Sequence, residues 1–442
     1  MEKQQGQFYL FGQRRFLPFF ATQFFGALND NLFKNALLVI VVSGGVSATA
    51  SDANFLTNLA AGLFILPYFL FSTTAGQLAD KYDKAWLIKR IKFAEILIML
   101  VGCYALMTKN VGMMMGVLFA LGAQSAFFGP IKYAIIPQHL ATHELMSGNA
   151  QVGMGTFVSI LLGTLLGAWL VSYDQGTLLV GMLAMLVAVA GWLSSCQIPS
   201  APADSGEIML SFNPFTETLR NFRFAREDMS VFYCIVSISW FWLFGGSFLT
   251  QVPNFAVTVL QGHPTLISVL LGAFIVGVAI GSVLCAKLSK GQVEPGLIPI
   301  GAIGLTLFST DIFFSSNAYQ LANPTALDVL PLQFFTLTSA LRVFFDLTAI
   351  GLFGGIFIVP LYALVQSRTA SNKRARVLAA NNVLNALFMV AGAAVGIVCL
   401  SVIQMSIPLF FLTVSLANLV FLCLLLWRVP EFKTRFLTWR IQ

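Results

Sequence analysis

Two side chains of opposite charge interrupt a long apolar stretch near the N-terminus. Residues 24–42 read FFGALNDNLFKNALLVIVV, in which Asp30 and Lys34 stand among three asparagines. On a helix, residues four positions apart lie one turn apart, and their side chains can meet. A charge at the centre of a bilayer costs about 2.5–3.5 kcal/mol on insertion-based scales. If this stretch crosses a membrane, the two charges therefore need each other, a polar cavity, or both.

The polar residues of this stretch share one helix face. At about 100° per residue, four of them fall within about 140° of arc, and these are Asp30, Asn31, Lys34 and Asn35. One interpretation is a neutralised ion pair with a structural role. We favour a substrate site, because leucine at both charged positions would meet a structural need at lower cost. A similar sequence later in the chain, FGGSFLTQVPNFA, supplies polar partners for this face, namely Thr250, Gln251 and Asn254.

The composition of the whole chain predicts an integral membrane protein. Of its 442 residues, 57% are hydrophobic and 10% are charged, and the mean hydropathy is +0.83, which lies outside the range of a soluble globular domain. Apolar runs of the roughly 20 residues needed to cross about 30 Å of hydrocarbon recur throughout. We predict an all-α protein with twelve transmembrane helices at about 17–43, 55–79, 91–108, 111–128, 150–172, 175–196, 231–260, 265–288, 295–316, 343–366, 379–401 and 406–428.

The basic residues indicate how the chain is oriented. With both termini placed in the cytoplasm, all 25 Lys and Arg residues except Lys34, Lys109 and Arg342 fall in cytoplasmic segments. This is the distribution expected from the retention of positive charge on that side of a membrane. The formal charge of +7 is then an orientation signal, and we expect no nucleic-acid partner.

The predicted spans divide into two sets of six. The longest cytoplasmic link, 197–229, separates an N-terminal half at 1–196 from a C-terminal half with a basic cytoplasmic tail at 230–442. The halves repeat each other, because FFGPIKYAIIPQ and SGNAQVGMGTF are matched by FIVPLYALVQ and AANNVLNALF, which pairs Asn149 with Asn381. Such repeats are typical of transporters whose halves move around a central site.

A loop between the second and third predicted spans resembles the signature loop of the major facilitator superfamily. It reads GQLADKYDKAWLIKR, in which Gly76, Asp80 and Lys84 fit the pattern, whereas Asp83 stands where glycine is usual. The resemblance implies the fold of that superfamily, with two six-helix halves. We expect Asp80 to help lock the halves at the cytoplasmic end through charge and capping contacts. The other expected gating residues are Gly76, Lys84 and, in GPIKYAIIPQ, Lys132.

Four further motifs resemble the bacterial lysophospholipid transporter family, which includes a transporter domain fused in some relatives to an acyltransferase and an acyl-carrier-protein ligase. They are FGALNDNLFKNALL, FFGPIKYAIIPQHL, GNA at 148–150 and NNVLNALF at 381–388, and the similarity covers essentially the whole chain. The resemblance implies movement of lysophospholipids, notably lysophosphatidylethanolamine, from the outer to the inner leaflet of the bacterial inner membrane. Reacylation would follow on a separate acyltransferase. The resemblance also implies functional roles for Asp30, Asn31, Lys132, Tyr133 and Asn149.

The chain departs from this family's pattern at two places. Gly153 stands where many relatives have glutamate, and Thr250 and Gln251 replace an arginine that some members carry. A zwitterionic head group would be bound by complementary charges, with its ammonium at Asp30 and its phosphate at Lys34. The remaining predicted substrate contacts are Asn35, Asn254, Asn381 and Trp242. We expect a monomer surrounded by membrane lipids, acting without a cofactor.

Other functions stay open on the sequence alone. A proton-driven exporter of drugs, siderophores or other amphiphiles would use the same cavity, with Asp30 as its proton carrier. A scaffold or enzyme subunit would not need a charged stripe at mid-membrane. The six cysteines lie in or beside predicted spans without C-x-x-C spacing, so we expect no metal site, no catalytic residue and no enzyme activity. We expect three further carboxylates to reach water, those of Glu95, Asp311 and Asp346.

Overall fold

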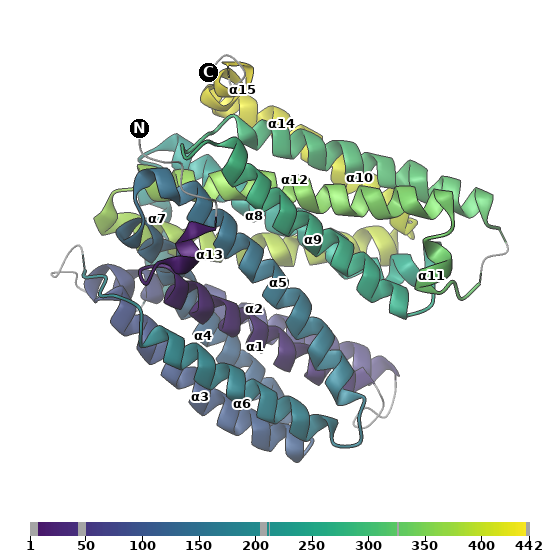
Figure 1. Cartoon of the computed structure of the whole chain (residues 1–442), viewed down its shortest axis with the longest axis horizontal. Coiled ribbons are helices and arrows are strands. Elements are labelled where there is room, and N and C mark those ends of the chain that lie inside the picture. The colour runs from purple at the N-terminus through teal and green to yellow at the C-terminus, as the bar shows by residue number, and fades with distance from the viewer. Residues whose placement is uncertain (1–7, 43–49, 204–209, 212, 325–326, 439–442) are drawn as a thin grey trace. The chain divides into compact units, whose positions relative to one another are not determined.

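The computed structural model describes residues 8–42, 50–203, 210–211, 213–324 and 327–438. These parts are helical apart from their connections and an isolated β-bridge between Gly262 and Val329 (Figure 1). The long helices are α1 (Leu17–Val42), α2 (Ala50–Lys81), α3 (Lys84–Met107), α4 (Val111–His139), α5 (Leu145–Val171), α6 (Gly176–Ser195), α8 (Met229–Asn254), α9 (Thr265–Leu288), α10 (Leu297–Ala322), α12 (Thr338–Arg368), α13 (Ser371–Ile397) and α14 (Ile407–Arg428). The shorter helices are α7 (Pro214–Ala225), α11 (Pro331–Phe334) and α15 (Pro430–Thr438).

Each of the twelve predicted spans corresponds to one long helix. Among the described residues, eleven helical segments are long and apolar enough to cross a membrane. The remaining one, α3, has 24 residues, and it is less apolar because its first turns carry Lys89, Arg90, Lys92 and Glu95. The predicted all-α membrane fold is therefore confirmed, with α3 as the long helix that carries the most charged side chains.

Local sequence explains where several helices begin. The Asp83 carboxylate accepts a hydrogen bond from the Trp86 amide at 2.8 Å and caps α3. The Asn110 side chain accepts one from the Met113 amide at 3.0 Å and caps α4. Each cap satisfies an N–H group that the first turn of a helix leaves without an internal partner. The polar residues between spans thus fix the start of the next helix.

The chain forms two compact units, which are described separately. Unit 1 contains Met1–Gly148, Gly155–Asp228 and Gln366–Ala386, and unit 2 contains Asn149–Met154, Met229–Val365 and Leu387–Gln442. The first turns of α13 therefore belong to unit 1, although they come from the C-terminal half of the sequence. The contacts of α13 with α2 and α4 are consequently internal to unit 1.

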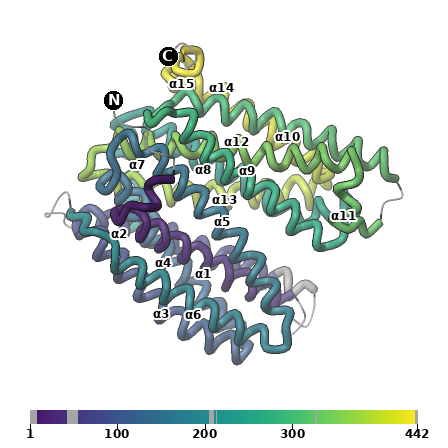
Figure 2. Tube along the Cα trace, in the orientation of Figure 1, coloured from purple at the N-terminus to yellow at the C-terminus, as the bar shows by residue number. Residues whose placement is uncertain are grey.

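In unit 1, α1 packs among α2, α4 and α6, while α2 lies beside α4 and α3 lies beside α6 (Figure 2). A buried cluster that includes Phe33, Leu118 and Ala184 fills the space between α1, α3, α4 and α6. Helix α5 approaches α1 closely, because a Cβ at Gly163 would lie 2.5 Å from the Leu28 carbonyl oxygen. Small residues permit such backbone contact between membrane helices, and this contact fixes the face that α1 presents to α5.

In unit 2, α10 lies beside α14 (Figure 2). Asn418 of α14 donates to the Ala302 carbonyl oxygen at 3.1 Å and accepts from Trp240 Nε1 at 2.8 Å. The Trp240 ring stacks on Phe421, with ring centroids 4.8 Å apart. Trp240 therefore joins α8 to α14 through both its polar and its apolar parts.

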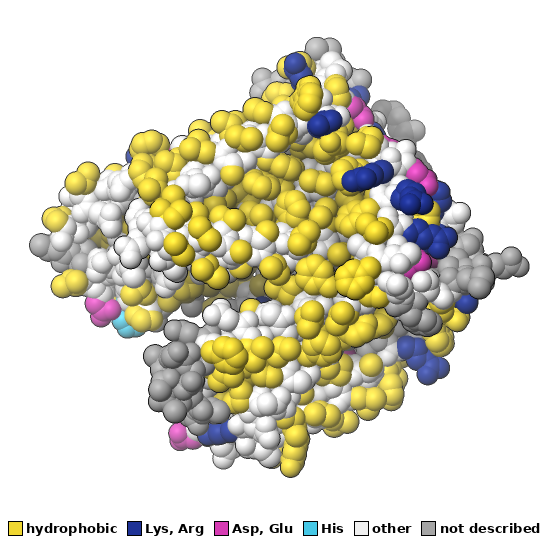
Figure 3. Space-filling model, turned by 180° about the vertical axis from the view of Figure 1, so that it is seen from behind, with side chains coloured by type: hydrophobic (Ala, Val, Ile, Leu, Met, Phe, Trp, Pro, Cys, Tyr) yellow, Lys and Arg dark blue, Asp and Glu magenta, His cyan; other side chains and the backbone are white. Residues whose placement is uncertain are grey.

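The surface is largely apolar. On the face drawn in Figure 3, hydrophobic side chains spread over much of the surface, and most of the Lys and Arg side chains in view gather near the right-hand edge. Large apolar side chains are exposed in the middle of long helices, among them Leu186 at 65% and Val420 at 60%. An aqueous surface rarely carries apolar patches of this extent, whereas a surface that faces lipid does.

Candidate functional site

Asp30 lies in α1 inside unit 1 and is buried, with 7% of its surface exposed. The Ser125 hydroxyl of α4 donates a hydrogen bond to Asp30 Oδ2. The other carboxylate oxygen, Oδ1, is buried and has no hydrogen-bond partner among the described residues. A carboxylate oxygen removed from water without a partner is costly, so this atom is placed to accept a donor from a ligand.

Lys34 does not pair with Asp30, as the alternative interpretation of a neutralised ion pair would require. Its Nζ donates instead to Asn31 Oδ1 at 3.0 Å, and it lies 5.6 Å from the centroid of the Phe64 ring. Lys34 thus folds back over its own helix because Asn31 offers an acceptor three residues earlier, a spacing that faces it as readily as Asp30 does. Asn35 donates to Thr164 of α5 at 3.1 Å and anchors the end of the polar face.

A second pair of charges, outside the site predicted from the sequence, lies beside this stripe. Lys92 Nζ lies 2.6 Å from Glu95 Oε2, and both side chains are 1% exposed. Asn29 of α1 donates to Glu95 Oε1 at 2.9 Å, and Gln124 of α4 donates to Glu95 Oε2 at 3.1 Å. Glu95 therefore joins three helices. The expectation that Glu95 reaches water is therefore wrong, and Lys92, which the sequence placed in a cytoplasmic segment, is buried beside it.

A signal for this pair was present in the sequence. Lys92 and Glu95 have opposite charges, stand three residues apart, and precede an apolar run, much as Asp30 and Lys34 do in α1. The positive-inside rule explained Lys92 without reference to Glu95. The spacing of the two residues on one helix face was the more informative feature.

Lys132 of α4 is also buried, at 9% exposed, so it is not a solvent-facing positive charge as its predicted position in a cytoplasmic segment suggested. Its Nζ donates to the Thr156 hydroxyl of α5 at 2.8 Å, and that hydroxyl donates to Gln23 Oε1 of α1 at 2.9 Å. Gln23 Nε2 is buried and finds no hydrogen-bond partner in the part of the chain that the structure describes. Lys132 Nζ also lies 5.2 Å from the Tyr133 ring centroid. Three helices of unit 1 thus converge on a second polar group.

Two of the predicted gating residues, Gly76 and Asp80, meet the first turns of α13 inside unit 1. Arg376 Nε donates to Asp80 Oδ2 at 2.9 Å, and the Ala375 amide approaches Asp80 Oδ1 at 3.3 Å. A Cβ at Gly76 would lie 3.1 Å from Arg376 Cα, so only glycine lets the two helices come this close. Lys84 is buried at the start of α3, at 1% exposed. The signature loop therefore holds α13 through one charge and one small residue.

The other predicted contacts are distributed between the units. Asn381 lies in unit 1, where it is buried and its Oδ1 has no hydrogen-bond partner within the described ranges. In unit 2, Asn254 donates to Gln251 at 3.3 Å, and Thr250 donates to the Gly246 carbonyl oxygen of its own helix at 2.9 Å. The other two predicted contacts in unit 2 are Asn149, which is buried, and Trp242, which is half-buried against Phe241.

The carboxylates of α10 and α12 in unit 2 serve local contacts. Asp311 accepts two hydrogen bonds from Arg342, at 3.0 and 2.6 Å. Asp346 is 1% exposed and accepts from the Ser315 hydroxyl at 2.6 Å, so the expectation that it reaches water is wrong. Across the residues that the structure describes, no group of three or more His, Cys, Asp or Glu side chains could hold a metal ion.

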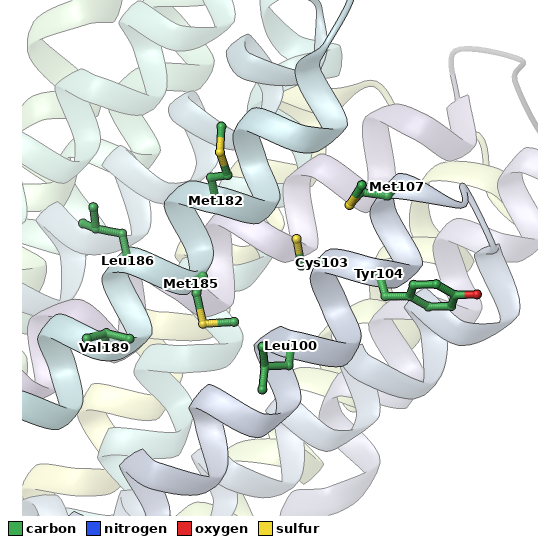
Figure 4. A pocket seen from close by; sticks show the side chains of 8 residues that line it. All are labelled: Leu100, Cys103, Tyr104, Met107, Met182, Met185, Leu186 and Val189. Carbon is green, nitrogen blue, oxygen red and sulfur yellow. The ribbon is translucent and has the colours of Figure 1, made fainter.

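An apolar groove of about 600 Å³ lies between α3 and α6 (Figure 4). It is lined by Leu100, Cys103, Tyr104, Met107, Met182, Met185, Leu186 and Val189. The lining offers no charge to a polar head group, and several of its side chains are exposed on the outer surface of unit 1. This groove is therefore separate from the polar groups around Asp30.

Two relatives support the resemblance seen in the sequence. The lysophospholipid transporter LplT of Cronobacter sakazakii (strain ATCC BAA-894) is 24% identical over 361 residues, which cover 77% of this chain and 82% of that protein. LplT of Yersinia pestis (strain Pestoides F) is 24% identical over 364 residues, which cover 80% of this chain and 79% of that protein. The predicted similarity to this family is confirmed.

Solved structures share the fold. The human organic anion transporter MFSD10 (TETRAN) aligns with a TM-score of 0.72 at 16% identity, over 93% of this chain and 99% of that one. The fucose:proton symporter FucP of E. coli aligns with a TM-score of 0.69 at 14% identity, over 94% of this chain and 99% of that one. Residues 19–341 match the family model described as Major Facilitator Superfamily. Because that match covers most of a chain that also has the fold, this protein belongs to the Major Facilitator Superfamily.

Proposed function

We propose that this protein moves lysophospholipids, with lysophosphatidylethanolamine as the main substrate, from the outer to the inner leaflet of the bacterial inner membrane. Both termini would lie in the cytoplasm, and a separate acyltransferase would reacylate the product. The proposal is supported by relatives that are named lysophospholipid transporters and by the membership of the chain in a transporter superfamily. It assigns a transport role, without a catalytic step, to the polar groups of unit 1.

The observation that carries the proposal is the free acceptor of Asp30. Its Oδ1 is buried and unpartnered, and no ion pair neutralises its charge among the described residues. An ammonium group supplies both a positive charge and hydrogen-bond donors, and such charge-assisted bonds are about twice as strong as neutral ones. The site therefore suits a substrate that carries its own cation.

Lys34 is the proposed anchor for the phosphate. It stands one turn beyond Asp30, about 6 Å along the axis at about 1.5 Å per residue, and its Nζ is bound by a neutral acceptor, the Asn31 amide. A phosphate can replace that amide with a stronger, charge-assisted bond. Asn31, Asn35 and the Lys132 group would complete the polar lining, and the single acyl chain would follow apolar helix surfaces.

The substrate is already dissolved in the membrane, and the two charged anchors can stay ionised throughout the cycle. Movement between leaflets by alternating access therefore needs no proton transfer to Asp30. We expect collapse of a proton gradient to leave the rate nearly unchanged.

The test is a leaflet-asymmetry assay with labelled lysophosphatidylethanolamine in proteoliposomes of the full chain, run with and without an uncoupler. A fatty acid lacks the ammonium and a diacyl lipid carries a second chain, so both should move more slowly. A hydrophobic cation is added as a competitor. Failure of lysolipid movement together with uncoupler-sensitive transport of the cation would replace the proposal with a proton-driven exporter.

A further inference from the structure

Two lysines flank Asp30, and each is bound by another acceptor. Lys34 donates to Asn31 Oδ1 at 3.0 Å. Lys92 donates to Glu95 Oε2 at 2.6 Å. Within the described part of the chain, the Asp30 carboxylate therefore forms no ion pair, although two lysines contact neighbouring positions on its helix.

Lys92 reaches from α3 to α1 near Asp30. A Cβ at Gly26 would overlap Lys92 Nζ, so the ammonium of Lys92 rests on α1 at Gly26, four residues before Asp30. One helical turn rises about 5.4 Å, and a lysine side chain has four rotatable carbons. The Lys92 ammonium therefore contacts α1 about one helical turn before the residue that carries the Asp30 carboxylate.

We infer that Glu95 reserves Asp30 for the ammonium of the substrate by holding Lys92 away from it. This inference rests on the proposed function. Without Glu95, a buried Lys92 would have no carboxylate of its own, and a buried cation seeks the nearest anion because an unpaired one is costly. Asp30 is that anion, so Lys92 would occupy the place of the head group.

The hydrogen bonds around Glu95 also orient the groups that face Asp30. Glu95 accepts from Gln124 Nε2 at 3.1 Å, which leaves Gln124 Oε1 toward the Ser125 hydroxyl, 3.3 Å away. Ser125 donates to Asp30 Oδ2. Glu95 is therefore a positioning residue that acts through Lys92 and Gln124 and does not contact the substrate itself.

A purely structural account of the Lys92–Glu95 pair is less economical. Two charges that only hold α3 in place could be replaced by apolar residues with little loss or even a gain in stability. The pair instead lies near the Asp30 carboxylate, which can bind the substrate ammonium only while Lys92 stays bound to Glu95. The head-group preference of binding separates the two accounts, because a structural defect weakens all lysolipids alike.

The experiment compares the binding of lysophosphatidylethanolamine and lysophosphatidylglycerol to the purified full chain in detergent. The two lipids share one acyl chain and a phosphate, but only the first has an ammonium. In E95Q, the preference for lysophosphatidylethanolamine should fall at least about tenfold, the size expected for one charge-assisted hydrogen bond. In the double variant E95Q/K92M, the preference should return to that of the unmodified protein, because no cation is left to occupy Asp30.

The matched control is Glu144→Gln. Glu144 is also a buried glutamate of unit 1 with a basic partner, Arg15, at 2.6 Å, and its loss should leave the preference unchanged. An unchanged preference in E95Q, or parallel loss for both lipids without recovery in E95Q/K92M, would overturn the inference. If E95Q does not fold, the test rests on the folded double variant E95Q/K92M. Loss of the preference for lysophosphatidylethanolamine in that variant would refute the inference. An unmodified protein that binds neither lipid refutes the proposed function instead.

Discussion

Arg376 Nε donates to Asp80 Oδ2 at 2.9 Å, although 296 positions separate the two residues in sequence. Asp80 is fully buried, and Arg376 is 8% exposed. The bond ties the last turn of α2 to the first turns of α13. Its strength does not come from surface electrostatics, because both charges are shielded from water.

The bond leads to a prediction about the gate. Asp80→Asn removes one charge-assisted hydrogen bond of about 1.5–3 kcal/mol, which should shift a conformational equilibrium by about tenfold to a hundredfold. We expect slower transport in liposomes and nearly unchanged lysolipid affinity in detergent. Equal losses in the two measurements would argue against a gating role.

Gly76 supports the same contact by its size. A Cβ there would lie 2.7 Å from the Ala379 Cβ and 3.0 Å from the Ala375 carbonyl oxygen, so the helices must separate to accept it. Gly76→Ala should slow transport and lower the unfolding temperature by an amount that corresponds to about 1–3 kcal/mol of overpacking. Gly116→Ala is the control, because nothing lies within 4 Å of its added Cβ. Similar behaviour of the two variants would contradict the close-packing argument.

The charges of α1 provide a second test of the site. If Asp30 and Lys34 merely neutralised each other, Asp30→Asn combined with Lys34→Met should restore what either single change loses. The side chains bind different partners, Ser125 and Asn31, so we expect the double variant to reach the membrane and remain inactive. Transport regained by the double variant would refute the binding role of this pair.

Gly26 keeps room for the ammonium of Lys92. Gly26→Ala should push Lys92 Nζ away from Glu95 and so lower the preference for lysophosphatidylethanolamine over lysophosphatidylglycerol. The loss of stability should not exceed about 1–3 kcal/mol, because the displaced atom is the end of a flexible side chain. Gly191→Ala is the matched control, since its Cβ would lie 4.0 Å from Lys92 Cδ in ordinary contact. Equal head-group preference in both variants would speak against the space requirement.

Asp83 gives a pH-dependent prediction outside the membrane spans. Burial acts to raise its pKa, but hydrogen bonds from Ser200, Trp86 and Ala201 outweigh burial and hold the pKa below the usual 3.8. A carboxylate whose pKa is lower in the folded state stabilises the fold above its unfolded pKa, and this contribution is lost as the pH falls through the folded pKa.

Asp83→Asn should therefore lower the unfolding temperature of the detergent-solubilised protein at about pH 7, and the difference from the unmodified protein should shrink below about pH 3.8. Thermal unfolding of both proteins across this range is the measurement. The effect should be small because Asp83 is partly exposed. A difference that stays constant down to about pH 3 would show that Asp83 acts through its shape and not through its charge.

Much of this protein could be predicted from its sequence. Spans of about 20 apolar residues give an unambiguous signal, because an isolated apolar helix must match the thickness of the bilayer whatever its neighbours are. The polar face of Asp30 and Lys34 followed from helical periodicity, and the motif containing Gly76 and Asp80 indicated the superfamily. These features depend on one helix or one loop at a time.

The partner of each charge was decided only by the tertiary structure. On its own helix, Lys34 could bind either Asp30 or Asn31. From the sequence, Lys92 could either face the cytoplasm or pair with Glu95. The choice depends on how α1, α3 and α4 are rotated about their axes, which brings Asn29 and Gln124 to Glu95 and Ser125 to Asp30. Those rotations are set by the packing of apolar side chains such as Phe33 and Leu118. This packing depends on several helices together, so the sequence of one helix does not determine it.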